Sequence, residues 1–334
     1  MTSVGIIANP ASGKDIRRVA AHAIAANNHQ KANIVRRLLL ALVASGVDHI
    51  EIMPDPFGIG VRALKGLENH PQVQPATSLI DMPVEANEQD TLWAARYLRD
   101  AGAACIVVLG GDGTCRVVSK GCGQVPLLPI STGTNNVVPY FVEGTAAGLA
   151  AGYLARHPDL SLERTCYRHK RLLVWVDGQV RDQALVDVGL LETRFTGSKA
   201  IWGTEELRQV FVTRAHPQNI GISSVIGVVR PVGPTHPGGV CVTISGDGRR
   251  VLAPIAPGKL AQVGIGELQD MEPGVGYPVA GPRPAVLSLD GEREIILSTG
   301  SQAEIILDLE GPWIVDVERT LSLAAVEGSF IEGT

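Results

Sequence analysis

The chain has 334 residues and a mass of 35.3 kDa, is 45% hydrophobic and 4% aromatic, and carries a formal net charge of −5. Its length predicts about two domains with a core large enough to fold without disulfides, and its 38 glycines and 21 prolines exclude a helical bundle. The mild acidic balance argues against nucleic acid as a partner and against a polybasic membrane-binding surface. The five cysteines form no CxxC pair and no segment has the pattern of a signal peptide or a membrane span, so we expect a cytoplasmic protein.

The first half of the chain alternates strand-like and helix-like segments. Continuous apolar runs predict strands that are covered on both faces, and apolar residues at helical spacing predict helices between them. The predicted strands are 3–8, 49–53, 103–109 and 125–130, and the predicted helices are 15–45, 88–101 and 145–155. This alternation predicts an α/β fold with a doubly wound, mostly parallel sheet.

Beyond about Arg156 the helical periodicity largely disappears. Short β-rich runs follow, separated by turn signals that include 177–178, 246–248 and 290–291. The predicted strands are 172–176, 180–188, 222–229, 240–244, 286–289 and 304–309. A basic run at 164–171 is interpreted as a solvated edge strand. We therefore expect an α/β domain over 1–158, an all-β domain over 159–310, and a segment over 311–334 that packs back on the first domain.

The most specific motif is Gly110-Gly111-Asp112-Gly113-Thr114, which lies between a predicted buried strand and a predicted helix. Ligands of open α/β sheets bind at this end of a strand, and glycines there let backbone amides approach an anion. Asp112 is therefore a candidate general base or metal contact, although a tight turn with Asp112 as the helix cap explains the pentapeptide equally well. The spacing excludes a Walker A loop, which needs Gly at position 8, and a dinucleotide fingerprint, which needs Gly at position 116.

Two further polar loops follow predicted strands of the first half. A hydroxyl, a glycine amide and a lysine can hold phosphate oxygens, and small hydroxyl and carboxamide side chains supply donors without net charge. The residues concerned are Asn9, Ser12, Gly13 and Lys14 in one loop, and Ser131, Thr132, Gly133, Thr134, Asn135 and Asn136 in the other. A plain polar turn is the alternative for each loop.

Two acidic positions in the second half are also candidates. Asp187 lies within an apolar run, and because a buried unpaired carboxylate is costly, it needs solvent, a partner or a ligand. Asp290-Gly291-Glu292 ends a predicted strand, where a simple hairpin turn is the default interpretation.

Taken in this order, the motifs resemble the superfamily of NAD kinases, diacylglycerol and sphingosine kinases, and 6-phosphofructokinases. The stretches IIANPASGKDIRR, GGDGT and ISTGTNN are more closely similar to the ATP-NAD kinase-like AcoX family, which is associated with acetoin catabolism gene clusters. The resemblance implies an NAD kinase-like fold with the active site between an α/β and a β domain. It implies that the GGDGT loop holds nucleotide phosphates and that Asp112 assists deprotonation of the acceptor hydroxyl. It also implies ATP and Mg²⁺ as cofactors, with no dedicated metal site because Mg²⁺ arrives with ATP, and a homo-oligomer, either a dimer or a tetramer.

The chain departs from the NAD kinase pattern in its second half. NAD kinases carry an Asn-Glu pair that recognises the dinucleotide, and the matching Val186-Asp187 keeps the acid but loses the amide. The Gly- and Ser/Thr-rich segment with which NAD kinases contact the ligand has only a weak similarity here, at 221–233. The triplet ending in Glu292 resembles lipid kinases, which makes Glu292 a rival base, and Asp187 and Asp290 are the predicted acceptor-binding residues. We expect an ATP-dependent phosphotransferase that acts on NAD or a related small molecule. The alternatives are a kinase for a lipid or small polyol, and an inactive NAD- or ATP-binding regulator.

Overall fold

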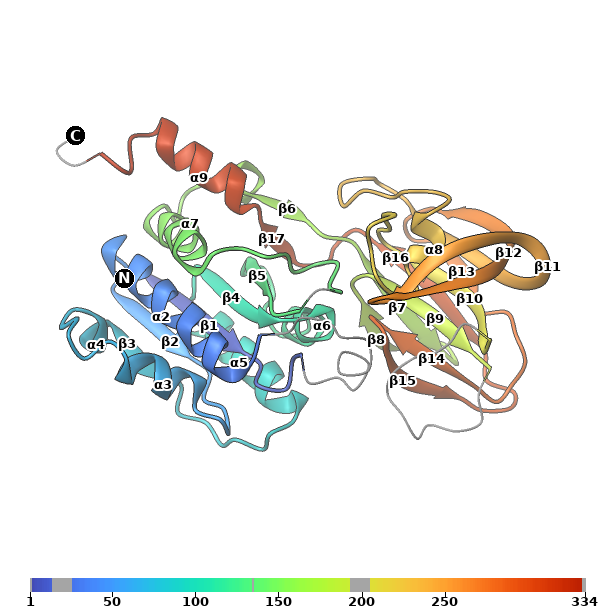
Figure 1. Ribbon diagram of the computed structural model, residues 1–334, viewed down its shortest axis with the longest axis horizontal. Coiled ribbons are helices and arrows are strands. Elements are labelled where there is room, and N and C mark those ends of the chain that lie inside the picture. The colour runs from blue at the N-terminus through green and yellow to red at the C-terminus, as the bar shows by residue number, and fades with distance from the viewer. Residues whose placement is uncertain (1, 14–25, 134, 193–204, 332–334) are drawn as a thin grey trace.

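The computed structural model consists of an α/β body and a β-rich body that lie side by side (Figure 1). The structure describes residues 2–13, 26–133, 135–192 and 205–331. The fold class predicted from the sequence is confirmed, because a mostly parallel sheet with helices is followed by antiparallel sheets. No helix in the described ranges is long and apolar enough to cross a membrane.

The α/β body is built on a seven-stranded sheet in the order β3-β2-β1-β4-β5-β17-β6. Pairing is parallel from β3 to β17, and only β6 runs antiparallel to its neighbour. Its strands are β1 (Ser3–Ala8), β2 (His49–Ile52), β3 (Thr77–Leu79), β4 (Cys105–Gly110), β5 (Leu127–Ser131), β6 (Cys166–Arg168) and β17 (Trp313–Val315).

Helices cover both faces of this sheet. The described helices of the body are α2 (Asn28–Ala44), α3 (Ile59–Lys65), α4 (Val73–Ala76), α5 (Glu88–Asp100), α6 (Asp112–Ser119), α7 (Gly144–Arg156), the 3₁₀ turn η1 (Leu162–Arg164) and α9 (Val317–Val326). Helices α2 and α7 pack on one face through apolar side chains such as Leu38 and Ala150, while α5 and α6 pack on the other through Leu98 and Val118. A Cβ on Gly148 of α7 would lie 2.7 Å from the Ala41 Cβ, so a glycine is required for α2 and α7 to approach this closely.

The β-rich body contains two antiparallel sheets. The larger has the order β12-β11-β10-β9-β14-β15, and the smaller has the order β13-β16-β7-β8. Their strands are β7 (Arg171–Val176), β8 (Gln179–Ala184), β9 (Asp187–Leu191), β10 (Leu207–Val212), β11 (Gly239–Ala256), β12 (Lys259–Met271), β13 (Gly276–Pro278), β14 (Ala285–Leu289), β15 (Glu292–Leu297) and β16 (Ala303–Asp308). Buried side chains from both sheets, including Leu172, Leu190 and Leu307, form one shared core, as in a sandwich.

Three predictions for the second half are wrong. The predicted strand 222–229 contains helix α8 (Ser224–Gly227), whose amides bond to carbonyls three or four residues back. The run 180–188 forms two strands, because the amides of Leu185 and Val186 donate to the Asp290 carboxylate rather than to a neighbouring strand. The turn predicted at 246–248 is an irregular stretch inside β11, where the pairing register shifts between Ile244 and Arg249.

The basic run at 164–171 is not a solvated edge strand throughout. His169 is fully buried, and Lys170 is 3% exposed. The Lys170 ammonium donates to the carbonyls of Gly233, His236 and Gly238 at 2.7–3.3 Å, which ties β7 to the loop before β11. Burial lowers the pKa of Lys170 to about 8. A run of basic residues can therefore include a buried lysine that binds backbone carbonyls, and need not be a solvent-exposed edge strand.

The helix predicted over 15–45 is observed as α2, which begins at Asn28 and ends at Ala44. Asn27 caps it by accepting from the Gln30 amide while the Gln30 side chain accepts from the Asn27 amide. Residues 15–25 lie outside the described ranges. This capping box fixes where the helix starts, close to the loop at the end of β1.

Candidate functional site

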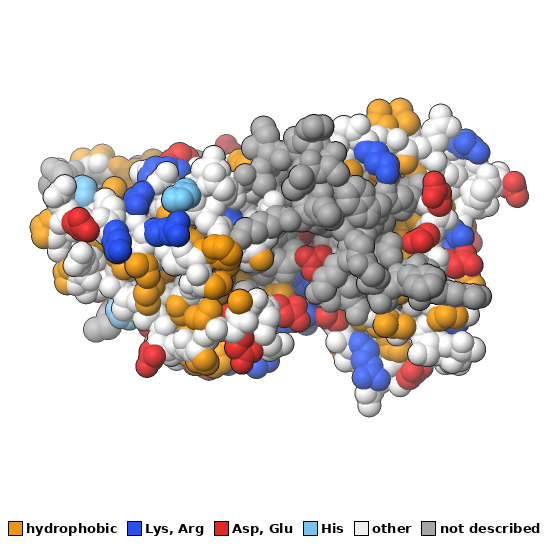
Figure 2. Space-filling model, turned by 60° about the horizontal axis from the view of Figure 1, so that its bottom comes forward, with side chains coloured by type: hydrophobic (Ala, Val, Ile, Leu, Met, Phe, Trp, Pro, Cys, Tyr) orange, Lys and Arg blue, Asp and Glu red, His pale blue; other side chains and the backbone are white. Residues whose placement is uncertain are grey.

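A pocket of about 780 Å³ lies between the two bodies, at the carboxyl ends of β1 and β4. Figure 2 shows acidic side chains gathering where the bodies meet. The predicted site residues that line the pocket come from both bodies: Asn9, Ser12, Gly13, Gly111, Asp112, Gly113, Thr114, Asn135, Asn136, Asp187, Asp290 and Glu292. The structure thus brings together residues that are separated by as much as 283 positions in the sequence, from Asn9 to Glu292.

The other predicted site residues do not line the described pocket. Gly110 is the last residue of β4, and a Cβ there would lie 2.6 Å from the Thr114 Oγ1. Ser131 and Thr132 are buried behind the pocket, and the Ser131 Oγ donates to the Gly133 carbonyl at 2.5 Å. These residues support the lining loops and do not face the pocket. Lys14 and Thr134 lie outside the described residues.

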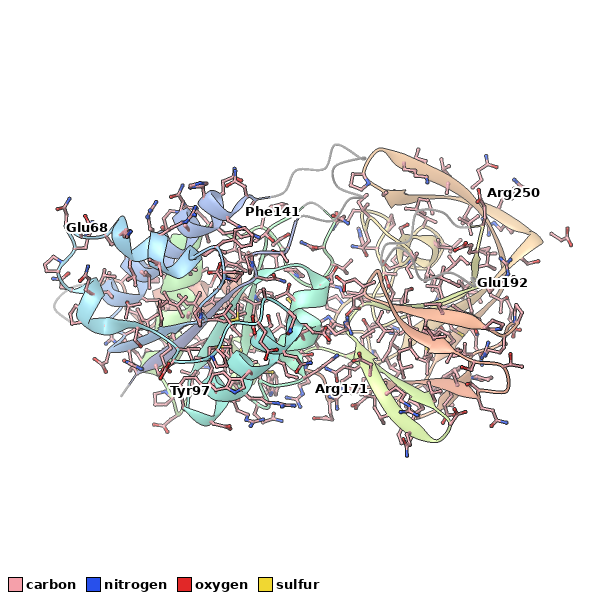
Figure 3. The ribbon with its side chains drawn as sticks, turned by 90° about the horizontal axis from the view of Figure 1, so that it is seen from below. Glu68, Tyr97, Phe141, Arg171, Glu192 and Arg250 are labelled. Carbon is pink, nitrogen blue, oxygen red and sulfur yellow. The ribbon has the colours of Figure 1, made fainter. Side chains whose placement is uncertain are left out.

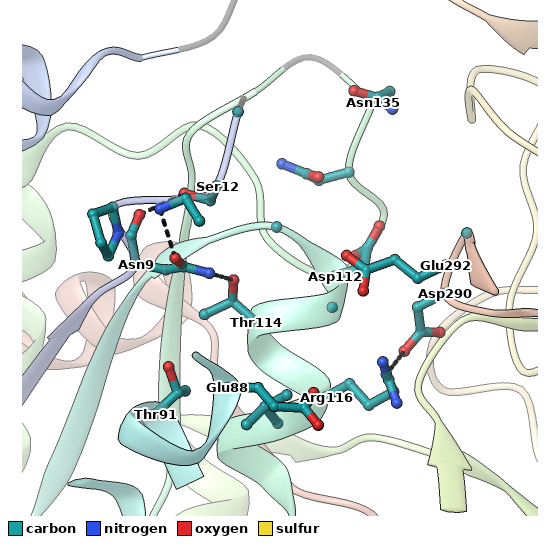
Figure 4. Close-up of a pocket in the computed structure, with 18 of the residues that line it drawn as sticks. Asn9, Ser12, Glu88, Thr91, Asp112, Thr114, Arg116, Asn135, Asp290 and Glu292 are labelled. Carbon is teal, nitrogen blue, oxygen red and sulfur yellow. Dashed lines mark hydrogen bonds and ion pairs between the residues drawn. The ribbon is translucent and has the colours of Figure 1, made fainter. Parts of the chain in front are cut away.

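The GGDGT segment forms a strand-to-helix turn. Gly111 is the N-cap of α6, and Asp112 is its first residue, so Asp112 does not cap the helix. Both Asp112 oxygens instead accept backbone amides of the loop after β5: the Val137 amide lies 3.1 and 3.0 Å away, and the Val138 amide lies 2.7 Å away. The carboxylate therefore joins the GGDGT turn to the loop after β5. These hydrogen bonds fix its orientation at the pocket wall (Figure 4).

The environment of Asp112 tunes its proton affinity. Burial raises the pKa of Asp112 to about 7, and the nearby Asp290 carboxylate adds to the rise, while the two amides partly oppose it. A carboxyl group that titrates near neutrality can accept a proton at physiological pH and release it again. This is the property that a general base in this position needs.

The loop after β1 is tied to the GGDGT helix and to the loop after β5. The side-chain Nδ2 of Asn9 donates to the Thr114 Oγ1 at 2.9 Å, and the Ser12 hydroxyl lies 3.0 Å from the Thr132 hydroxyl. Beneath the loop, the fully buried Lys31 donates to the carbonyls of Asn9 and Ser12 at 2.8 and 2.7 Å. An ammonium group that binds these carbonyls fixes the loop and places a positive charge under it.

The opposite wall of the pocket centres on the β14–β15 hairpin. Asp290 has a φ of 50° in its turn, and its fully buried side chain accepts the amides of Leu185 and Val186. Arg116, which is 1% exposed on α6, has its Nε 3.7 Å from the Asp290 Oδ2 and its Nη1 3.1 Å from the Asp182 Oδ2. Burial raises the pKa of Asp290, and Arg116 opposes that rise.

Glu292 lies over the first turn of α6. A Cβ on Gly113 would lie 3.2 Å from the Glu292 Oε1, so the absence of a side chain at position 113 makes room for this carboxylate. Figure 4 shows the Asp112 and Glu292 side chains side by side at the N-terminus of α6. The two candidate bases therefore share one place in the pocket, and Glu292 is the more exposed of the two.

The acid at position 187 is buried, with 5% of its surface exposed. Burial and the neighbouring Asp290 and Asp112 carboxylates raise the pKa of Asp187 well above its usual value. Ser223 lies beside it, yet the Asp187 Oδ1 and the Ser223 Oγ both lack a partner in hydrogen-bond geometry within the described ranges. Both residues line the pocket. A pair of buried, unsatisfied oxygens in a pocket can be satisfied by a ligand that carries hydroxyl or amide groups.

Sequence reasoning missed Lys31, Arg116 and Ser223. Lys31 follows the same helical face as Val35 and Leu38, so its position in that apolar pattern was a usable signal of burial. Arg116 stands four residues after Asp112, on the same face of α6. Ser223 gave no signal, because its segment was expected to be a strand.

Comparisons with known proteins show the family to which the chain belongs. The family profile described as ATP-NAD kinase N-terminal domain matches residues 4–157, and that of the acetoin catabolism protein X C-terminal domain matches residues 170–310. Acetoin catabolism protein X of Cupriavidus necator is 42% identical over 316 residues, which cover 91% of this chain and 87% of that protein. The chain belongs to the acetoin catabolism protein X family. A structure from Bacillus anthracis described as a "putative diacylglycerol kinase" aligns with a TM-score of 0.45 and 11% identity, covering 94% of this chain and 96% of that one.

The NAD kinase-like half of this family implies the use of ATP with a divalent metal. Within the described ranges, no group of three or more His, Cys, Asp and Glu side chains is placed to hold a metal ion. The pocket carboxylates of Asp112 and Asp290 already accept backbone amides. The described residues therefore do not by themselves form a metal site.

Proposed function

We propose that this protein is an ATP-dependent phosphotransferase that transfers the γ-phosphoryl group of ATP to a hydroxyl of NAD or a related small molecule. One observation carries the proposal: a single pocket is lined by the loops of an ATP-NAD kinase-like half and by the buried acids of the second half. Phosphoryl transfer depends chiefly on positioning and charge neutralisation, and a pocket between two bodies can position a donor against an acceptor.

The N-terminal wall is the nucleotide side in this proposal. The turn from Gly111 to Thr114 presents backbone amides at the start of α6, and the loop from Asn9 to Gly13 lies beside it, joined by the hydrogen bond from the Asn9 side chain to the Thr114 Oγ1. Amides at a helix start attract phosphate oxygens. Because the described lining is rich in carboxylates, the triphosphate enters as its Mg²⁺ complex, which reduces the repulsion.

The C-terminal wall is the acceptor side. The acceptor hydroxyl lies beside Asp112, which takes its proton while the acceptor oxygen bonds to the γ-phosphorus and the bond to the bridging oxygen of ADP breaks. Asp187 and Ser223 supply the oxygens that the rest of the acceptor satisfies. A sugar with several hydroxyls fits such a wall better than an apolar chain, which favours NAD or a polyol over a lipid.

The test incubates purified protein with ATP, Mg²⁺ and NAD and detects NADP with an NADP-specific dehydrogenase. An Asp112→Asn variant is the control, since Asn keeps the shape and can still accept an amide. We expect NADP from the wild type and none above background from the variant. Wild-type protein that binds ATP and NAD by calorimetry yet forms no NADP would contradict NAD as the acceptor. If a panel of polyols and lipids were also not phosphorylated, the protein would be a nucleotide-binding regulator.

Other expectations from the sequence stay predictions. They are the division of the chain near residues 158 and 310, the dimer or tetramer, and the cytoplasmic location. The prediction that the closing segment packs back on the first domain is supported by the pairing of β17 with β5 and β6 and by the contact of α9 with α7.

A further inference from the structure

Arg116 is one of the largest fully buried side chains in the described chain. It lies one helical turn after Asp112 on α6, and it is the only cationic side chain among the described residues that line the pocket. Burying a guanidinium group is costly unless carboxylates pair with it. The carboxylates that Arg116 contacts therefore indicate the role of its side chain.

The contacts of Arg116 cross from the α/β body to the β-rich body. Its Nη1 donates to the Asp182 Oδ2 at 3.1 Å on β8, and its Nε lies 3.7 Å from the Asp290 Oδ2 in the β14–β15 turn (Figure 4). The same helix face adds Lys120, whose Nζ lies 2.6 Å from the Asp182 Oδ1. The side-chain Nε2 of Gln183 on β8 also donates to the Ser119 Oγ at 2.7 Å. Helix α6 is thus docked on β8 by charge, and Arg116 is the residue that extends the contact to the turn.

The turn that Arg116 reaches carries Glu292 to the pocket. Asp290 and Gly291 both have positive φ values, 50° and 82°, so this is a tight and specific turn. Its geometry depends on the Asp290 carboxylate, which accepts the Leu185 and Val186 amides. Two residues further on, Glu292 lies over Gly113, at the start of the helix that bears Arg116. The β14–β15 turn therefore contacts α6 at two places, through Asp290 at Arg116 and through Glu292 at Gly113.

We propose that Arg116 is a positioning residue that locks the Asp290 turn to helix α6 and so fixes the distance between the neighbouring Glu292 and Asp112 side chains in the pocket. The phosphotransfer part of this inference rests on the proposed function, whereas the structural part does not. Arg116 acts through Asp290 and is not assigned a contact with substrate. A guanidinium group suits this task better than an ammonium group because its fork can address two carboxylates at once.

The first test is structural and needs no turnover. Hydrogen exchange of the Leu185 and Val186 amides is measured in the wild type, in Arg116→Met and in Arg116→Lys. Arg171→Met is the matched control, because Arg171 lies near the junction of the two bodies (Figure 3) and pairs with Asp308 and Gln183 but has no described contact with Asp290. We expect these amides to exchange at least about tenfold faster in both Arg116 variants and at the wild-type rate in Arg171→Met. Unchanged exchange in folded Arg116→Lys would overturn the proposal.

The second test uses the phosphotransfer reaction. We expect kcat to fall about 10²-fold in Arg116→Lys while the KM for ATP changes little, because misplacement of a reacting group by about 1 Å has this effect. Guanidinium added at low concentration should restore part of the kcat of Arg116→Ala and none of that of Arg171→Ala.

The two tests separate the inference from the proposed function. Faster exchange of the Leu185 and Val186 amides in a protein whose wild type phosphorylates nothing would reject the phosphotransferase and uphold the lock. An active wild type with unchanged exchange and unchanged kcat in folded Arg116→Lys would uphold the phosphotransferase and overturn the lock.

Discussion

The two walls of the pocket differ in how their polar groups are satisfied. On the N-terminal wall Asn9 bonds to Thr114, Ser12 contacts Thr132, and Asp112 accepts two backbone amides. On the C-terminal wall Asp290 also accepts backbone amides, but the Asp187 Oδ1 and the neighbouring Ser223 Oγ are buried without a partner within the described ranges. On the N-terminal side the corresponding buried oxygen is the Asn135 Oδ1 alone among the described residues that line the pocket.

This difference indicates a division of labour. Paired groups hold a wall in one shape before a ligand arrives, so the N-terminal wall suits a ligand part that many enzymes share, such as a triphosphate. Buried unpaired groups cost free energy that only a matching ligand recovers, so the C-terminal wall is where an acceptor is selected.

The largest expected effect concerns the proton acceptor. Asp112→Asn should lower kcat by about 10³-fold, within the range for loss of a general base, because Asn cannot take the acceptor proton. Glu292→Gln should lower kcat by only about tenfold, because Glu292 is the more exposed group and shapes the same space. Steady-state kinetics of the two variants measure both values. A larger loss of kcat in Glu292→Gln than in Asp112→Asn would show that the base is Glu292 on the C-terminal wall and not Asp112 on the N-terminal wall.

Lys31→Met tests whether the N-terminal wall depends on its buried cation. The substitution removes the ammonium donor from the Asn9 and Ser12 carbonyls, of which the Asn9 carbonyl keeps the Ser12 hydroxyl as a donor, so we expect the KM for ATP to rise about tenfold and the protein to lose about 2 kcal/mol of stability. Denaturant melts and ATP titrations measure the two effects. Lys65→Met, at an exposed position on α3, is the control and should change neither. A normal KM for ATP in folded Lys31→Met would show that the loop does not need this charge.

Gly113→Ala tests the meeting of the two walls. The new Cβ would lie 3.2 Å from the Glu292 Oε1, so the carboxylate must shift by a few tenths of an ångström. We expect a several-fold fall in kcat, on the order of threefold to tenfold, with little change in melting temperature. Gly246→Ala is the control, since a Cβ there has no described atom within 4 Å. Equal activity of both variants would mean that Glu292 has no fixed place over α6.

The smallest expected effect is on the pH dependence of stability. Burial raises the pKa of Asp112 from 3.8 to about 7, so between these values the folded state holds a proton that the unfolded state has released. Stability contributed by this group is full below about pH 4 and is lost as the pH rises through about 7. Urea unfolding at pH 5 and pH 8 should therefore show a smaller decline for Asp112→Asn than for the wild type. An identical decline in both proteins would argue against the raised pKa.

The fold was largely predictable because the strongest signals were periodic. The apolar runs that predict β1, β4 and β5 lie within one or two residues of the observed strands, since strands covered on both faces have little freedom of sequence. The segment with α8 was misassigned because a short apolar run fits a strand and a helical turn equally well. The division of 180–188 could not be foreseen either, because it depends on Asp290, more than a hundred residues away.

The candidate site was predictable where glycines and small polar residues follow strands, and less so where charge is buried. Asp112 and Asn9 were found from such loops, and the structure places both in the pocket. Lys31 and Arg116 were missed because a charged residue on a helix is ordinarily a surface residue. Only tertiary packing shows that one lies under a loop and that the other lies between two bodies.

The most direct test of the two-wall account is a crossed binding measurement. Calorimetry with MgATP and with NAD is carried out on the wild type, on Ser12→Ala from the N-terminal wall and on Asp187→Asn from the C-terminal wall. The account predicts that Ser12→Ala weakens MgATP about tenfold and leaves NAD unchanged, and that Asp187→Asn does the reverse. Variants that each weaken both ligands equally, or that show the opposite assignment, would contradict it.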